Sequence, residues 1–254
     1  MKRTLLLSFV SLALGTAAHA ALIINPAIPI THKVQVQPII TQQTPGAGGA
    51  TATYFGTPTQ QAAIEGFIDQ IWAQVGVDIE FLPTTTYVND FAYEGTMDPR
   101  PTSDLNTIVS SAGTPPKSSN TAVLNMFFVE VAAGFGPLND NTVAGLAFVD
   151  ANGVTQYVGG NLPTFTAGHE VVASVVAHEL GHNLGLPHLV QAENLMQEAG
   201  SPNPGERLTA ADRVTILTDN AGLDGFELLQ PIPEPSGVLF GILALGMIGL
   251  RRRR

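Results

Sequence analysis

The sequence predicts a single α+β domain in which helices pack against a β-sheet. Three observations lead to this prediction. Residues 122–131 are apolar at all but two positions, as expected of a strand that is buried inside a sheet. Residues 59–75 and 166–184 place apolar side chains at helical spacing. About 210 residues remain between the two chain ends, which is enough for one domain with a sizeable core.

The remaining elements of the first half follow from local patterns. Residues 34–40 predict a first strand, interrupted by Pro38, and residues 44–53, rich in glycine, alanine and threonine, predict a loop. Residues 77–81 predict a second strand. Residues 83–121 hold many proline, serine, threonine and asparagine residues, which indicates a long surface loop.

The second half contains a hairpin and a last helix. Residues 143–149 and 154–158 predict two strands joined by the turn Asp150-Ala151-Asn152-Gly153. Thr209 and Asp212 stand three residues apart and predict a capping box. This box would open a last helix that ends near residue 218.

The most informative segment has the spacing H-E-x-x-H-x-x-G-x-x-H over residues 178–188. Residues four apart share one helix face, so His178 and His182 can bind the same metal ion. Glu179 lies beside the first ligand and can take a proton from metal-bound water. Gly185 accepts the left-handed conformation that ends a helix, which lets the chain fold back and supply His188. Three ligands and an open fourth position predict one catalytic Zn²⁺ ion.

Two alternatives stay open at this point. The same histidines could hold a structural zinc ion in a non-catalytic surface or extracellular-matrix protein. Glu179 and the open fourth position argue against this, because a structural site needs neither. A narrower alternative is a peptidase that trims peptide ends or cuts cell-wall peptides.

Two other histidines are not expected to bind this metal. His169 precedes His178 by nine residues, about 13.5 Å along a helix axis, and is expected at the helix start or on the surface. His32 lies near the expected mature N-terminus and is expected to be solvated.

The motif and the order of the predicted elements resemble the metzincin clan of zinc endopeptidases. This resemblance implies a metzincin-like catalytic domain, with a twisted mixed β-sheet packed on an active-site helix and a second helix, and a C-terminal helix. It also implies a methionine turn, which Asn194-Leu195-Met196 fits, with Met196 as apolar support for the ligands. By the same analogy, residues 143–149 form the edge strand above the cleft and bind extended substrate by strand addition.

The N-terminus predicts export. The chain begins with a charged Met1-Lys2-Arg3, continues with an apolar run over residues 4–14 and then reads Ala18-His19-Ala20. This is the pattern of a signal peptide over residues 1–20, and it is too short for a membrane-spanning helix. The catalytic domain is expected over residues 21–230.

Residues 231–254 contain Pro233-Glu234-Pro235, an apolar run over residues 236–250 and four terminal arginines. They resemble the PEP-CTERM sorting segment of Gram-negative bacteria, which an exosortase recognises. The resemblance implies transient inner-membrane anchoring through residues 236–250, followed by delivery to the cell surface or extracellular matrix. A plain tail anchor is the alternative, although a stable span needs about 20 residues.

The charge balance limits the classes of molecule that the domain is expected to bind. Residues 21–250 hold five basic and 21 acidic residues, a net charge of −16, so the domain should repel nucleic acid. The absence of cysteine excludes disulfides and a cysteine-switch prodomain. The sequence therefore predicts an exported zinc-dependent endopeptidase that acts on protein or peptide substrates through Glu179 and metal-bound water, with an exosortase-type sorting enzyme as partner.

Overall fold

The structure, a computed structural model, describes most of the predicted catalytic domain. The described residues are 22–46, 51, 54–89, 117–129, 145–147, 149, 152, 154–157, 169–197, 205–219 and 227–233. The predicted signal peptide and the apolar run with its arginine tail lie outside these ranges. No helix within these ranges is long and apolar enough to cross a membrane.

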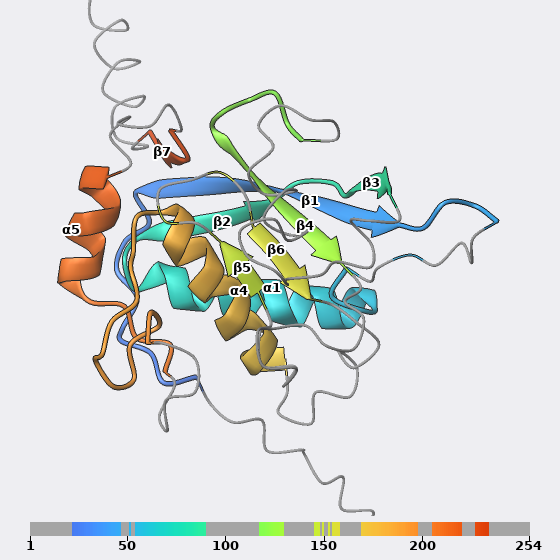
Figure 1. The fold of residues 1–254 in the computed structure, drawn as a ribbon. Coiled ribbons are helices and arrows are strands. Elements are labelled where there is room, and N and C mark those ends of the chain that lie inside the picture. Colours follow the sequence, from blue (N-terminus) through green and yellow to red (C-terminus); the bar gives the residue numbers. More distant parts are fainter. Residues whose placement is uncertain are drawn as a thin grey trace, which may run out of the picture.

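A long central strand, β1 (His32–Gln42), organises a seven-stranded sheet (Figure 1). On one side it pairs in parallel first with β2 (Val77–Phe81) and then with β3 (Thr85–Val88). On the other side it pairs in parallel with β4 (Val123–Val129) and antiparallel with β7 (Leu229–Pro231).

The sheet ends in the predicted hairpin. β6 (Val154–Tyr157) runs parallel to β4, and β5 (Gly145–Ala147) runs antiparallel to β6 as the last strand of the sheet. The sheet is therefore mixed, and β5 lies at its edge among the strands that the structure describes, as predicted.

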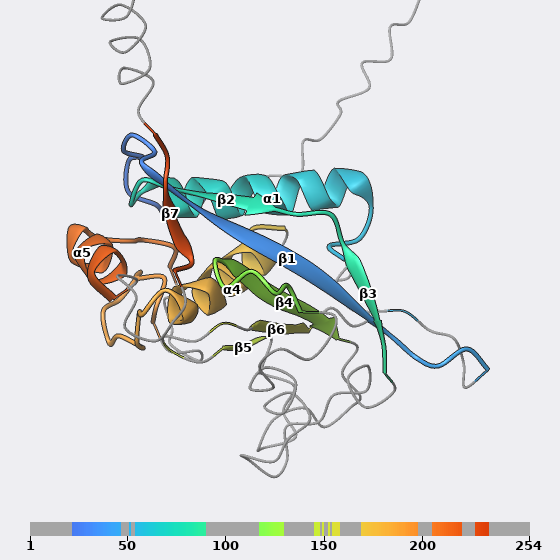
Figure 2. The same cartoon turned by 90° about the horizontal axis from the view of Figure 1, so that it is seen from above.

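Two helices, α1 (Pro58–Ala73) and α4 (His169–Asn183), pack side by side on one face of the sheet (Figure 1; Figure 2). Their buried side chains and those of the strands form one apolar core. A capping box at Thr57 opens α1. This arrangement confirms the predicted α+β class.

The last helix, α5 (Ala210–Asp219), begins with the predicted capping box. The backbone N–H of Thr209 donates to Asp212 Oδ2 (2.7 Å), and the backbone N–H of Asp212 donates to Thr209 Oγ1 (3.2 Å). Asp212 is buried, so this box also fixes a carboxylate inside the protein.

Three predictions about the first half are wrong. β1 continues through Pro38, which lies where its neighbour on one side changes from β2 to β3, so little pairing is lost to the missing N–H. Residues 85–88, predicted as loop, form β3, because pairing with β1 satisfies the backbone of this mostly polar segment. His32 is half-buried rather than solvated, because it begins β1 between β2 and β7.

Candidate metal centre

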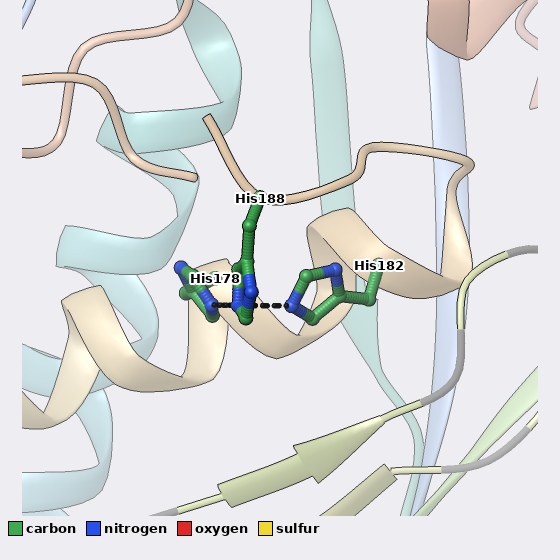
Figure 3. Close-up of side chains that lie close together, drawn as sticks. All are labelled: His178, His182 and His188. Atoms are coloured by element: carbon green, nitrogen blue, oxygen red, sulfur yellow. Dashed lines mark hydrogen bonds between the residues drawn. The ribbon is translucent and has the colours of Figure 1, made fainter. Parts of the chain in front are cut away.

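Three histidine rings converge at the C-terminal half of α4 (Figure 3). His188 Nε2 lies 3.2 Å from His178 Nε2 and 3.1 Å from His182 Nε2. His178 and His182 come from one face of α4, and His188 comes from the loop that follows the helix. Among the described residues, these three histidines form the one group of side chains that could hold a metal ion.

Backbone carbonyls orient two of these rings. His178 Nδ1 donates to the Leu195 carbonyl (2.7 Å), and His182 Nδ1 donates to the Leu186 carbonyl (2.8 Å). A carbonyl only accepts, so the proton of each neutral ring must be on Nδ1. The Nε2 atoms of both rings therefore present lone pairs toward His188.

This donor set fits zinc. A proton on His188 Nε2 could be donated to the Nε2 of His178 or to that of His182, but not to both. The Nε2 lone pair left without that proton would then face and repel the neighbouring ring nitrogens unless a cation lies between them. Tetrahedral zinc with nitrogens at about 2.0–2.1 Å holds those nitrogens about 3.3–3.4 Å apart. The observed separations of 3.1 and 3.2 Å are close to that value.

Burial favours the neutral rings that metal binding requires. Burial, with a smaller contribution from His178, lowers the pKa of His182 to about 4. Burial also lowers the pKa of His178. Both rings therefore stay deprotonated at neutral pH, the form that ligates a metal.

The turn after α4 brings the third histidine back to the helix. Gly185 has a φ of +88°, its N–H donates to the His182 carbonyl, and the Leu186 N–H donates to the Gly181 carbonyl. These two bonds are the Schellman pattern that ends a helix at a left-handed glycine. The same turn points the Leu186 carbonyl at His182 Nδ1. The turn that ends α4 therefore also orients the ring of His182.

Met196 occupies a turn directly beneath the ligand helix. The Gln197 N–H donates to the Asn194 carbonyl, and the Met196 N–H donates to Asn194 Oδ1 (2.7 Å). Met196 is fully buried, and a Cβ on Gly181 would overlap its sulfur. The turn therefore packs Met196 under α4, and its role as a methionine turn that supports the ligands stays a prediction.

Glu179 points toward the edge of the sheet. Its carboxyl group is buried and accepts a hydrogen bond from the backbone N–H of Ala147 in β5. Burial raises the pKa of Glu179 to about 8, and the Ala147 bond opposes that rise. A carboxyl group with a pKa near neutrality is suited to both accepting and returning a proton.

Several groups in this centre were missed by the sequence analysis. The orienting carbonyls of Leu186 and Leu195, and the Ala147 amide, are backbone atoms, which side-chain patterns do not reveal. Asn194 was predicted only as part of the turn, yet it is buried and its Nδ2 donates to Asp212 Oδ2 (3.2 Å). It therefore connects the turn that orients His178 to the capping box of α5.

Replacing Asn194 with alanine should weaken zinc binding by roughly 10- to 100-fold, the usual effect of losing a group that orients a ligand. The change removes the bonds to Met196 and Asp212 that hold the Leu195 carbonyl in place. Competition with a chelator of known affinity would measure it. Gln37→Ala is the control, because it also removes two side-chain bonds, which Gln37 Nε2 donates to the carbonyls of Pro38 and Pro83. Equal zinc affinity in both variants would contradict this role.

Comparison with known proteins identifies related families and folds. The sequence model described as metallo-peptidase family M12B, reprolysin-like, matches residues 60–189, a stretch that includes the three histidines and Glu179. No curated protein matches the chain.

Several solved structures are similar in fold. Archaemetzincin from Methanopyrus kandleri is 14% identical, with a TM-score of 0.46 over 74% of this chain and 95% of that one. Archaemetzincin from Archaeoglobus fulgidus is 14% identical, with a TM-score of 0.41 over 72% and 99%. Metalloproteinase-II from Bacteroides fragilis is 13% identical, with a TM-score of 0.43 over 77% of this chain and 55% of that one.

Proposed function

Because this chain belongs to the reprolysin-like metallopeptidase family M12B, we propose that it is an exported endopeptidase that uses Glu179 as its general base. The membership, together with the histidine cluster, makes it a metallopeptidase whose site fits one catalytic zinc ion. The observation that carries the finer proposal is the position of Glu179, buried beside the histidines and bonded to the edge strand β5.

The proposed chemistry divides between the metal and the protein. Zinc held by His178, His182 and His188 would supply Lewis acidity toward the scissile carbonyl and the attacking water. Glu179 takes a proton from that water as it attacks and passes the proton to the leaving amine. The Ala147 N–H holds the carboxyl group in place, and burial excludes competing solvent from it.

The proposed substrate is an extended segment of protein. Among the described strands, β5 is the last of the sheet, so its outer edge can pair with a peptide by strand addition. Since Ala147 of β5 also bonds Glu179, a peptide paired there would pass beside the proposed base. An internal segment can occupy such an edge with both ends free, which favours an endopeptidase over an enzyme that trims ends.

The experiment that tests the proposal combines metal content with cleavage. Protein purified without added metal should contain one zinc per chain and should cut an unfolded protein such as casein. A chelator should abolish cleavage, and added zinc should restore it. One zinc per chain without any cleavage would favour the alternative of a structural zinc in a surface or matrix protein.

Export is a second part of the proposal, and it rests on the two chain ends. The native exported protein should begin near Ala21 and lack residues 236–254, because the signal peptide and the sorting segment are both removed. Intact-mass measurement on material from the cell surface or matrix checks this. A mass that retains the four arginines would contradict sorting-segment removal and favour a plain membrane anchor.

A further inference from the structure

Two buried asparagines lie where the hairpin of β5 and β6 joins the rest of the sheet. Asn125 interrupts the otherwise apolar β4 and is 3% exposed, and Asn152 precedes β6 and is 9% exposed. A buried amide is costly unless it is hydrogen-bonded. The partners of these two side chains therefore explain why they are tolerated there.

The two amides bond to each other and to the backbone of β4. Asn152 Oδ1 accepts from Asn125 N (2.9 Å) and from Asn125 Nδ2 (3.1 Å). Asn152 Nδ2 donates to the Val123 carbonyl (2.8 Å). A backbone N–H only donates and a carbonyl only accepts, so these partners fix the orientation of the Asn152 amide. Asn125 Oδ1 in turn accepts from Ser118 N (2.8 Å).

These bonds extend the pairing of β4 beyond the end of β6. Backbone pairing between β4 and β6 begins at Met126 and Val154, two residues after Asn152. Before that point, the Asn152 side chain forms hydrogen bonds with the backbone of β4 that a neighbouring strand would otherwise form. We call this pair of side chains, Asn125 and Asn152, the asparagine clasp.

The asparagine clasp lies at the end of the hairpin that faces the catalytic centre. Ala147, whose N–H bonds Glu179, is paired in register with Val154. In the described part of the chain, β5 pairs with β6 alone, so the position of Ala147 depends on how firmly β6 is held to β4.

We propose that Asn152, held by Asn125, is a positioning residue that sets the place of β5 relative to Glu179 and to bound substrate. This inference rests on the proposed function, because it assigns β5 a role in holding both Glu179 and the peptide. Without Asn152, the Asn125 N–H loses its partner, the Val123 carbonyl keeps only the longer bond from Asn125 Nδ2 (3.4 Å), and the hairpin can shift. The Ala147 N–H then no longer meets the Glu179 carboxyl group.

The test compares zinc-loaded Asn152→Ala with a matched control, Thr41→Val. Thr41 Oγ1 donates to the Phe128 carbonyl (2.7 Å), so the control also removes a buried bond to β4, but from the β1 side. Both variants should lower the melting temperature and keep one zinc per chain. Only Asn152→Ala should lower kcat/KM, by roughly 10- to 100-fold, with kcat decreasing and KM increasing together.

Hydrogen exchange gives a readout that needs no turnover. The Ala147 amide should exchange faster in Asn152→Ala than in wild type or Thr41→Val, while the amides of α1 stay protected. If Asn152→Ala does not fold, Asn152→Ser takes its place, because the serine hydroxyl can still bond one backbone partner. Its Ala147 amide should exchange faster than that of wild type, and its kcat/KM should be lower. Equal exchange and equal kcat/KM in the two substitutions would overturn the inference. A wild-type protein that cleaves nothing would count against the proposed function, and exchange at Ala147 would still test the clasp.

Discussion

Replacing Glu179 with alanine should lower turnover by roughly 10²–10⁴-fold, the usual contribution of a positioned acid–base group. The carboxyl group is buried and bonded to Ala147 rather than being one of the three clustered ligand side chains. The variant should therefore keep its zinc and its fold while losing the group that moves the proton. Steady-state kinetics, elemental analysis and a melting curve on the same sample check all three expectations.

Glu179→Gln is the matched variant, because it keeps the size and the acceptor oxygen for Ala147 while removing the basic oxygen. It should be as slow as the alanine variant but closer to wild type in stability. Wild-type turnover in either variant would mean that another group is the base or that a contaminating protease cuts the substrate.

Replacing His188 with alanine should reduce bound zinc well below one per chain and abolish cleavage. His188 reaches the cluster from the loop after α4, so its loss leaves the helix and its two ligands intact. Two histidines make a poor zinc site, which is why the expected effect is larger than for a residue that only orients a ligand. Elemental analysis after dialysis measures the zinc content.

His169→Ala is the control for this substitution, because His169 begins the same helix but does not belong to the cluster. It should keep one zinc per chain. Zinc retained in His188→Ala at the wild-type level would remove His188 from the ligand set.

In wild type, zinc should be released as pH falls, because protonated imidazole cannot ligate a metal. The lowered pKa of His182, about 4, shifts that release to lower pH.

The sequence could predict the parts of the site that depend on spacing along one helix. His178 and His182 share a face because they stand four residues apart, and Gly185 ends the helix because the turn requires a positive φ. Both follow from local geometry, which a sequence records directly. The roles of Glu179 as base and Met196 as support stay predictions.

The parts that depend on tertiary contacts could not be predicted. The Leu195 carbonyl orients His178 only because a turn 17 residues away folds beneath α4. Asn152 was predicted only as a turn residue, because its hydrogen-bond partners on β4 are 27 and 29 residues away in the chain. β3 was missed for the same reason, because its mostly polar residues become a strand by pairing with β1.

Cleavage of a mixed peptide library, read by mass spectrometry, tests the central claim most directly. Zinc-loaded wild type should cut bonds inside the peptides, because an edge strand can hold a segment with both ends free. The same protein treated with chelator, and Glu179→Ala with its zinc retained, should leave those bonds uncut on the same timescale. Cuts confined to peptide ends would contradict the endopeptidase assignment. No cuts by zinc-loaded, correctly processed wild type would contradict the catalytic role of the site.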